Sequence, residues 1–490
     1  MKSKRRWIVA AAMFILSATL ASCTVGPDYQ RPPLDVPAGY KSASSQPAPS
    51  ARLGQDWWRL FGDPVLNELE ESAIASNQSL KAAVARVAQA RASSQVVASQ
   101  FYPTVMANPS YQRARTSGNE VSGKAVTGNN YLIPLDLAYE VDVWGRVRRS
   151  YEASQAQMEA SVIDAEVVRQ TLTADVAVNY FTLRSLDAQA EILDRNVQTF
   201  KDHLELTKKQ FSTGMVSRID VAQAQSQLDV TLTSVIEVQR QRADTEHALA
   251  ILLGRAPSEL SLAKRPLDMT PPVIPPGLPS ELLRRRPDVA EAEQLLTAAN
   301  AQIGVAQANF YPTFSLSGAA GYESVNLRHA VDWQSRIWSI GPSVSIPIFE
   351  GGRLTASLAQ AKARYDELQA NYRQAVLGAY VDVEDALTDL HMRADAAAAQ
   401  NLAVNSSREY LQLAELQYKK GLTNYLLVVD ASRTLLTNEV SAEQIRNQRM
   451  IAAVLLIKAL GGGWDENRQT PAPSGQNAAA TSQPTTAPAK

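Results

Sequence analysis

The chain has 490 residues, a formal net charge of −1 and 20% charged residues. Because positive and negative charges nearly cancel, the chain has no excess of basic residues to attract nucleic acid. The composition therefore argues against a nucleic-acid-binding protein. Length alone predicts about three ordinary domains, an expectation that an internal duplication overrules.

The first 23 residues have the features of a lipoprotein signal. A basic start at residues 2–6 precedes an apolar run at residues 7–20, and small residues lead into Cys23, the only cysteine of the chain. We expect cleavage before Cys23 and its lipidation, with no disulfide or metal role for it. An ordinary signal peptide and an uncleaved anchor are the alternatives, but the apolar run is shorter than the ~20 residues of a spanning helix. Thr24 stands where an inner-membrane retention signal usually has Asp, which favours the outer membrane.

Changes in composition along the chain predict its segments. The stretch after Cys23 is rich in Pro, Ser and Ala, which indicates extended coil, and the C-terminal end is rich in Ala, Pro, Thr, Ser and Gln, which indicates disorder. The expected segments are a signal peptide (1–22), a lipidated extended segment (23–63), a first repeat (64–260), a Pro-rich linker (261–280), a second repeat (281–464) and a disordered tail (465–490).

The second half of the chain repeats the first. Four anchors return in the same order, the first after 209 positions and the others after 207, which indicates a duplication with a two-residue insertion or deletion. The anchors are Phe101-Tyr102-Pro103-Thr104 with Phe310-Tyr311-Pro312-Thr313, Gly145-Arg146 with Gly352-Arg353, Gly214 with Gly421, and Leu253-Gly254 with Leu460-Gly461.

Most of each repeat is expected to be helical. A first helix is predicted from Asp63-Pro64 to about Phe101. Residues 147–213 contain neither Gly nor Pro, and a helix of that length is a rod of roughly 100 Å. Residues 353–420 are its copy, interrupted only by Gly378, and residues 215–253 and 422–460 form a second, shorter pair. Rods this long and this regular are expected to pack against one another as coiled coils.

Between the helices, each repeat contains a pair of predicted strands, at about 104–144 and 313–349. From Tyr131 to Val143 apolar side chains alternate with Asp136, Ala138, Glu140 and Asp142, and the second repeat alternates in the same way. These runs have the ~9 to 11 residues of a transmembrane strand, and aromatic residues lie near several ends. A half-buried sheet in a soluble sandwich is the alternative.

Four transmembrane strands cannot close a barrel, because unpaired strand edges inside a bilayer are too costly. The chain is therefore expected to oligomerise. Two copies would give eight strands and a filled interior, whereas three would give twelve strands and leave room for a lumen.

The sequence resembles the TolC-like outer-membrane factor family, in its OprM- and NodT-like lipoprotein branch. The resemblance covers roughly residues 20–465 and rests on several motifs in a fixed order. They are Leu20-Ala21-Ser22-Cys23, Trp57-Trp58, Phe61-Gly62-Asp63-Pro64, the duplicated Phe-Tyr-Pro-Thr, Tyr139-Glu140-Val141-Asp142-Val143-Trp144-Gly145-Arg146, Leu283 with Arg285-Arg286-Pro287-Asp288, Pro347-Ile348-Phe349-Glu350-Gly351-Gly352-Arg353, Tyr418 with Gly421, Tyr425-Leu426 with Asp430-Ala431, and Lys458-Ala459-Leu460-Gly461-Gly462-Gly463-Trp464.

This resemblance implies a mixed α/β membrane protein: a homotrimer whose twelve-stranded β-barrel continues as a long α-helical coiled-coil barrel in the periplasm. It implies residence in the outer membrane of a Gram-negative bacterium. The implied function is passive export of drugs or other small molecules, delivered by an inner-membrane resistance-nodulation-division (RND) transporter through a periplasmic adaptor protein.

The resemblance also assigns a site. Gly214 and Gly421 would form the helix-break turns close to the adaptor, and Tyr418, Leu426, Asp430 and Arg433 would close the periplasmic aperture. From the sequence alone, Asp430 and Arg433 are an i,i+3 pair, and most such pairs are a solvated helix face that contributes a few tenths of a kcal/mol.

No arrangement of residues indicates an enzyme, a cofactor or a metal. The four histidines, at positions 203, 247, 329 and 391, do not have a metal-ligand spacing. A type I protein-secretion duct is an alternative with the same fold, and a structural envelope lipoprotein or a periplasmic hydrolase is an alternative of another class. The sequence does not identify the exported substrate, because no Met-rich or His-rich lining stands out.

Overall fold

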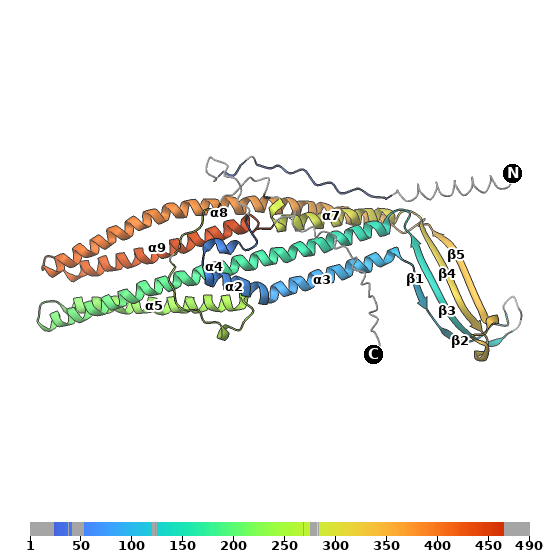
Figure 1. Ribbon diagram of the computed structural model, residues 1–490, viewed down its shortest axis with the longest axis horizontal. Helices are drawn as coiled ribbons and strands as arrows, with labels where there is room; N and C mark the ends of the chain where they lie inside the picture. Colours follow the sequence, from blue (N-terminus) through green and yellow to red (C-terminus); the bar gives the residue numbers. More distant parts are fainter. Residues whose placement is uncertain are drawn as a thin grey trace, which may run out of the picture.

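The protein is described by a computed structural model that covers residues 24–37, 39–41, 53–119, 123, 125–267, 269–274, 282 and 284–464. The expected signal peptide, Cys23 and the tail from residue 465 lie outside the described residues. The molecule is long and narrow, with a small β-sheet at one end and two pairs of long helices reaching the other end (Figure 1). The remaining helices lie in the middle and towards the sheet.

The helices are, in chain order, η1 (Trp57–Phe61), α2 (Pro64–Ser76), α3 (Gln78–Ala98), η2 (Ser99–Phe101), α4 (Arg146–Ser212), α5 (Arg218–Leu252), η3 (Pro257–Glu259), α7 (Pro287–Ala308), η4 (Leu327–His329), η5 (Trp333–Ser335), α8 (Arg353–Lys419) and α9 (Tyr425–Ala459). Among these, no helix combines the length and the apolar composition needed to cross a membrane. The long helices agree with the glycine- and proline-free runs. α4 and α8 each begin directly after a left-handed glycine, Gly145 (φ 82°) and Gly352 (φ 85°), where a residue with a side chain would be strained.

The expected continuous helix from Asp63 to Phe101 is wrong, because it breaks at Asn77. This residue has ψ 130°, which ends α2, and its side-chain oxygen accepts a hydrogen bond from the Leu80 backbone nitrogen at 2.9 Å. Asparagine is a strong helix N-cap because its side chain replaces the missing intrahelical acceptor. A second bond, from Asn77 Nδ2 to the Leu252 carbonyl at 2.9 Å, ties the break to the end of α5.

The sheet is antiparallel in the order β1-β3-β4-β5, with β2 also pairing to β3. Its strands are β1 (Thr104–Ala107), β2 (Ser110–Arg115), β3 (Thr127–Val141), β4 (Thr313–Ser324) and β5 (Arg336–Ser345). The four expected strand positions are present, but the first outer strand is divided into β1 and β2 around Pro109. Proline has no N–H for the ladder, and it interrupts pairing at a sheet edge. The two repeats meet at the centre, where β3 pairs with β4 from Tyr131↔Ser324 to Val141↔Phe314.

Two hydrophobic clusters form the interior. The larger cluster, here called the hub, joins α2, α4, α5, α7, α8 and α9 midway along the molecule, and its fully buried members include Leu66, Tyr180, Phe181, Met450 and Ile457. The smaller tip cluster joins the long helices near their turns. The hub also buries Trp57, Trp58 and Phe61 of η1, so the matched N-terminal motif is part of the core.

Candidate functional site

The two glycine turns at the far end of the molecule have the same geometry. Gly214 (φ 74°) donates to the Phe211 carbonyl, and Met215 donates to that of Gln210. Gly421 (φ 71°) donates to the Tyr418 carbonyl at 2.9 Å, and Leu422 donates to the Gln417 carbonyl at 3.0 Å. This is a Schellman motif, in which a left-handed glycine satisfies the last carbonyls of a helix and reverses the chain. Each turn therefore fixes the hairpin between a long and a short helix.

Tyr418, in the last turn of α8, connects the second hairpin to the first. Its hydroxyl donates a hydrogen bond to Gln210 Oε1 on α4 at 2.6 Å. Its ring lies 5.5 Å from that of Tyr425, measured between centroids. Partial burial raises the pKa of Tyr418 above its ordinary value, so the hydroxyl keeps its proton and remains a donor.

Tyr425, the first residue of α9, lies inside the tip cluster. It is 4% exposed, and burial raises its pKa to about 12. The ring of His203 on α4 lies 6.2 Å from it, and burial lowers the pKa of that imidazole. Both groups are therefore uncharged at neutral pH, as packing in an apolar cluster requires.

Leu426, Asp430 and Arg433 form an exposed stripe along α9, at positions i, i+4 and i+7, while Val428 and Ala431 face the tip cluster. Asp430 Oδ1 lies 3.9 Å from Arg433 Nη2, with both side chains at least half exposed. The hydroxyl of Tyr410 on α8 donates to Asp430 Oδ2 at a long 3.5 Å. Within one chain these contacts are weak, and the stripe is available to another molecule.

The structure thus separates the four residues of the expected aperture into two groups. Leu426, Asp430 and Arg433 lie on one exposed face, whereas Tyr418 is bound to α4. Sequence reasoning missed the partners Gln210 and Tyr410, because neither belongs to a motif and each partner is distant in sequence. Among the described residues, no group of three or more His, Cys, Asp or Glu side chains could hold a metal ion.

Comparison with known proteins connects this geometry to a family. The model of the family described as outer membrane efflux protein matches residues 69–255 and 278–462, most of the chain and both repeats. The chain is 32% identical to the outer membrane protein OprJ of Pseudomonas aeruginosa, over 95% of this chain and 98% of OprJ. It is also 32% identical to the toluene efflux pump outer membrane protein TtgF of Pseudomonas putida, over 93% of this chain and 97% of TtgF.

A solved structure agrees with the sequence comparison. The outer-membrane channel OprN superposes with a TM-score of 0.86 at 34% identity, and the match covers 90% of this chain and all of the OprN chain. The chain therefore belongs to the outer membrane efflux protein family.

Proposed function

We propose that this protein is the outer-membrane exit duct of a tripartite efflux system, a homotrimer in which three sheets close a twelve-stranded barrel and the helices extend it into the periplasm as a tunnel. The observation that carries the proposal is a sheet with two unpaired edges within the described chain, attached to helices far longer than a globular core needs. No step of the proposal requires catalysis, since a duct works by providing a passage.

Both edges of the sheet lack a partner strand within the described chain. β1 and β2 pair only with β3, and β5 pairs only with β4. Apolar side chains are exposed on these strands, among them Val105, Leu135, Val141, Trp338 and Ile340. Open edges in a bilayer leave backbone groups without hydrogen bonds, which further copies of the sheet would provide.

The dimensions of the sheet fit a bilayer. From Tyr131 to Val141, β3 covers about 34 Å of strand, which at a tilt of ~40° gives about 26 Å, close to the ~25 Å apolar band of outer-membrane barrels. Aromatic pairs lie near both ends of this stretch. Tyr111 stacks on Tyr131, and Trp144 stacks on Tyr311, each at 4.8 Å. Such pairs suit the two membrane interfaces, where aromatic residues are enriched.

The position of Thr24 supports lipidation of Cys23. Thr24 lies so close to Gly145 that a Cβ on that glycine would be 2.8 Å from the Thr24 methyl carbon, and the next residue, Val25, donates to the Trp144 carbonyl at 3.0 Å. The residue after Cys23 is therefore held beside the aromatic end of the sheet. Acyl chains on Cys23 would enter the inner leaflet of the outer membrane there.

At the opposite end, the exposed stripe on α9 is proposed to close the aperture. In a trimer, three copies of Leu426 would form an apolar constriction, and three Asp430 carboxylates would repel one another unless Arg433 or another donor held them. Gly214 and Gly421 would present the hairpin turns to a periplasmic adaptor protein. The adaptor and an inner-membrane RND transporter are the proposed partners, and the efflux names of relatives such as TtgF support export of small molecules.

The proposal is tested with the purified, full-length protein. Native mass spectrometry in detergent is expected to show a trimer whose protomers begin at an acylated Cys23, and planar-bilayer recordings are expected to show discrete channels. Monomers without conductance would instead support a structural envelope lipoprotein. A type I secretion duct would also conduct, and it is distinguished by the inner-membrane transporter that co-purifies.

A further inference from the structure

The segment of residues 260–267, which follows η3, passes from the first helical hairpin to the second at the level of the hub. Hydrogen bonds join it to α4 and α5 at its beginning and to α9 at its end. The two hairpins contact each other directly as well, since the hydroxyl of Ser185 on α4 donates to the Glu443 carbonyl on α9 at 3.4 Å. The segment adds a second connection, which is covalent to the end of the first hairpin and hydrogen-bonded to the second.

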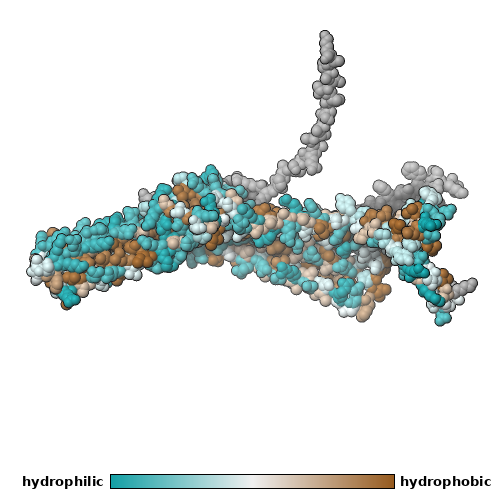
Figure 2. Space-filling view, turned by 90° about the horizontal axis from the view of Figure 1, so that it is seen from below, coloured by the Kyte–Doolittle hydropathy of each residue, from teal (hydrophilic) through white to brown (hydrophobic). Residues whose placement is uncertain are grey.

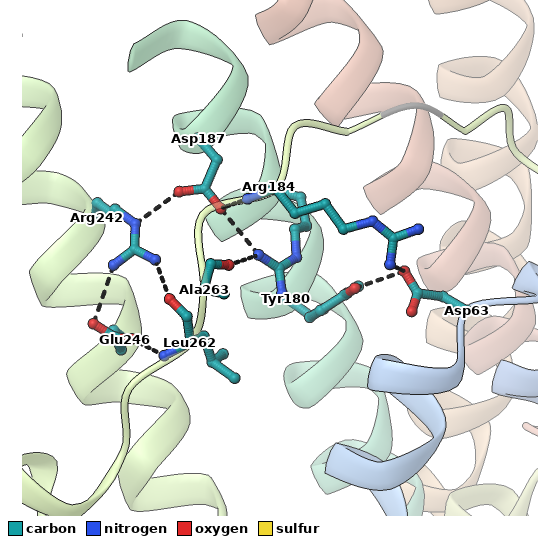
Figure 3. A network of polar contacts seen from close by, with 9 residues as sticks. Asp63, Tyr180, Arg184, Asp187, Arg242, Glu246, Leu262 and Ala263 are labelled. Atoms are coloured by element: carbon teal, nitrogen blue, oxygen red, sulfur yellow. Dashed lines mark hydrogen bonds and ion pairs between the residues drawn. The ribbon is translucent and has the colours of Figure 1, made fainter. Parts of the chain in front are cut away.

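The first end of the segment is fixed by a buried polar network (Figure 3). Asp187, with a side chain 1% exposed, accepts from Arg184 at 3.0 Å, from Arg242 at 2.7 Å and from the Arg265 backbone nitrogen at 3.0 Å. The arginines also donate to the segment's carbonyls, Arg184 to Ala263 at 2.8 Å and Arg242 to Leu262 at 2.6 Å. Each guanidinium thus has both a carboxylate and a backbone acceptor.

The network continues on both sides of Asp187. Glu246 of α5 binds Arg242 and accepts from the Leu262 nitrogen at 2.6 Å. On the other side, the Arg184 guanidinium lies over the Tyr180 ring, and the hydroxyl of Tyr180 donates to Asp63, the N-cap of α2, at 2.6 Å. Two helices of the first hairpin, the start of α2 and the segment are thereby bound together, and charged groups this deeply buried are costly to separate.

The corresponding positions of the second repeat do not reproduce this network. The counterparts of Asp187, Arg184, Glu246 and Arg242, 207 positions later, are Ala394, His391, Ala453 and Arg449. Only the last arginine is retained, and its Nε is buried without a hydrogen-bond partner among the described residues. At these positions the second hairpin therefore lacks the carboxylates that fix the first, and its own ion pair, between Asp382 of α8 and Arg286 at 2.8 Å, lies elsewhere.

At its other end, the segment meets α9 through Leu267. This side chain is buried in the hub, and its carbonyl accepts a hydrogen bond from Arg446 Nη1 at 3.1 Å. The arginine is 44% exposed and also contacts Glu443, one turn before it, at 3.1 Å. Arg446 and Glu443 line an open hollow of about 310 Å³ between α4, α8 and α9. An exposed, single hydrogen bond is easier to break than the buried network.

Arg446 lies where α9 leaves the hub. From Met450 to Leu460 most side chains of α9 are buried, whereas residues 433–449 contain no buried side chain in the single chain. The corresponding stretch of α5, residues 226–242, contains four, namely Leu228, Thr231, Val235 and Val238. Between Met450 and Arg446, α9 therefore passes from deep to partial burial, and a helix bends most readily where its packing weakens.

We propose that residues 260–267 act as a tether between the two hairpins, fixed to the first by the Asp187 network, and that Arg446 is the releasable latch that holds the second hairpin one turn on the tip side of its pivot at Met450. When the second hairpin swings away from the first, the Arg446–Leu267 hydrogen bond breaks while the network stays intact. The inference rests on the proposed function, since it assumes that the aperture opens by movement of α8 and α9. Arg446 is a positioning residue, far from the aperture stripe.

The test compares three variants of the full-length protein. Arg446→Ala removes the latch and is expected to raise the open-to-closed ratio in planar bilayers by about fivefold, as for the loss of one modest contact. Arg446→Lys keeps a cation within reach of the carbonyl and is expected to restore most of the closed state. Arg408→Ala is the matched control, because Arg408 lines the same hollow but binds Glu439 of α9 at 3.1 Å and does not contact the tether.

Hydrogen exchange separates the latch from the proposed channel function. Arg446→Ala is expected to speed exchange in α9 residues 433–449 and to leave α5 residues 226–242 unchanged, whether or not the protein conducts. If Arg446→Ala behaves like Arg408→Ala in both exchange and conductance, or only lowers the melting temperature, the latch is wrong. If no variant conducts but exchange changes as expected, the tether stands and the channel function fails.

Discussion

α4 and α8 each have 67 residues, α5 and α9 each have 35, and both hairpins turn at a left-handed glycine, yet the two hairpins differ in their interiors. Between Tyr180 and Leu204, α4 buries most of its side chains, whereas from Leu387 to Leu413 of α8 the buried side chain is Ser407 alone. Duplication has preserved the backbone while the packing has diverged. Apolar patches follow the helical rod towards the tips on the face that Figure 2 shows, so part of this surface is available for further copies or partners.

The two hairpins therefore differ in how firmly their helices are held. The first has buried aromatic and charged side chains that fix its helices to each other and to the hub. The second has few buried side chains in its middle within the single chain, and it carries the proposed aperture stripe of Leu426, Asp430 and Arg433. A weakly packed element costs less free energy to move, and elements that move are drawn from the least stable parts of a fold.

The largest expected effect comes from the core of the first hairpin. Phe200 is 2% exposed in the tip cluster, and Phe200→Ala is expected to lower the free energy of unfolding by about 3 to 5 kcal/mol. The position 207 residues later holds Ser407, whose hydroxyl binds Ala403 and Asn438. Ser407→Ala is expected to cost about 1 kcal/mol. Denaturant unfolding followed by circular dichroism measures both, and equal losses would contradict the comparison.

A second prediction concerns the buried network. Asp187→Asn removes the charge shared by Arg184 and Arg242 and is expected to destabilise the protein by about 3 kcal/mol. The matched change in the second repeat, Ala394→Asn, is expected to stay within about 0.5 kcal/mol. Thermal unfolding would show the contrast, and a mild Asp187→Asn phenotype would mean that the arginines find other acceptors.

The proposed aperture supplies a third comparison. Combined Leu426→Ala, Asp430→Ala and Arg433→Ala changes remove contacts of about 1 kcal/mol each and are expected to shift the closed-to-open equilibrium by about tenfold or more. Single-channel conductance and susceptibility to a large antibiotic such as vancomycin should both rise, with the trimer intact.

The control for this change uses the same face of α5. The positions 207 residues earlier hold Ile219, Gln223 and Ser226, and their combined replacement by alanine is expected to leave conductance unchanged. A correctly assembled aperture variant with wild-type conductance would place its stripe on a solvated helix face, and the constriction would lie elsewhere.

The smallest expected effect is a pH dependence in the tip cluster. Burial lowers the pKa of His203 from its ordinary value of 6.5, with Glu415, Asp202 and Lys419 as the neighbouring charges. The unfolded chain therefore takes up this proton before the folded chain does, and stability is lost as the pH falls below about 6.5. His203→Leu should remove this slope, whereas Tyr410→Phe, at the matching position of α8, should retain it. Melting temperatures across this pH range provide the measurement.

Much of the architecture is readable from the chain because it depends on local rules. The absence of Gly and Pro predicts the long helices, alternation of apolar residues predicts β3, and the repeated glycines predict both tip turns. The breaks at Asn77 and Pro109 were missed, although asparagine capping and a strand proline are local signals too. Of the proposed aperture, the exposed spacing of Leu426, Asp430 and Arg433 follows from helical periodicity, but the attachment of Tyr418 to Gln210 does not.

The sequence by itself determined the duplication, the helix lengths and the alternating strands. Each of these depends on residues that are close together in sequence or that repeat at a fixed interval. Only the tertiary structure decided which hairpin has a buried charged network and which has an exposed middle. Arg242 and Arg449 occupy the same place in their repeats, yet the first is bound by Asp187 and Glu246, whereas Ala394 and Ala453 stand at the positions of those carboxylates in the second. The contribution of a buried charge to stability depends on the groups that the fold brings next to it. Those groups are too distant in sequence for a local pattern to predict them.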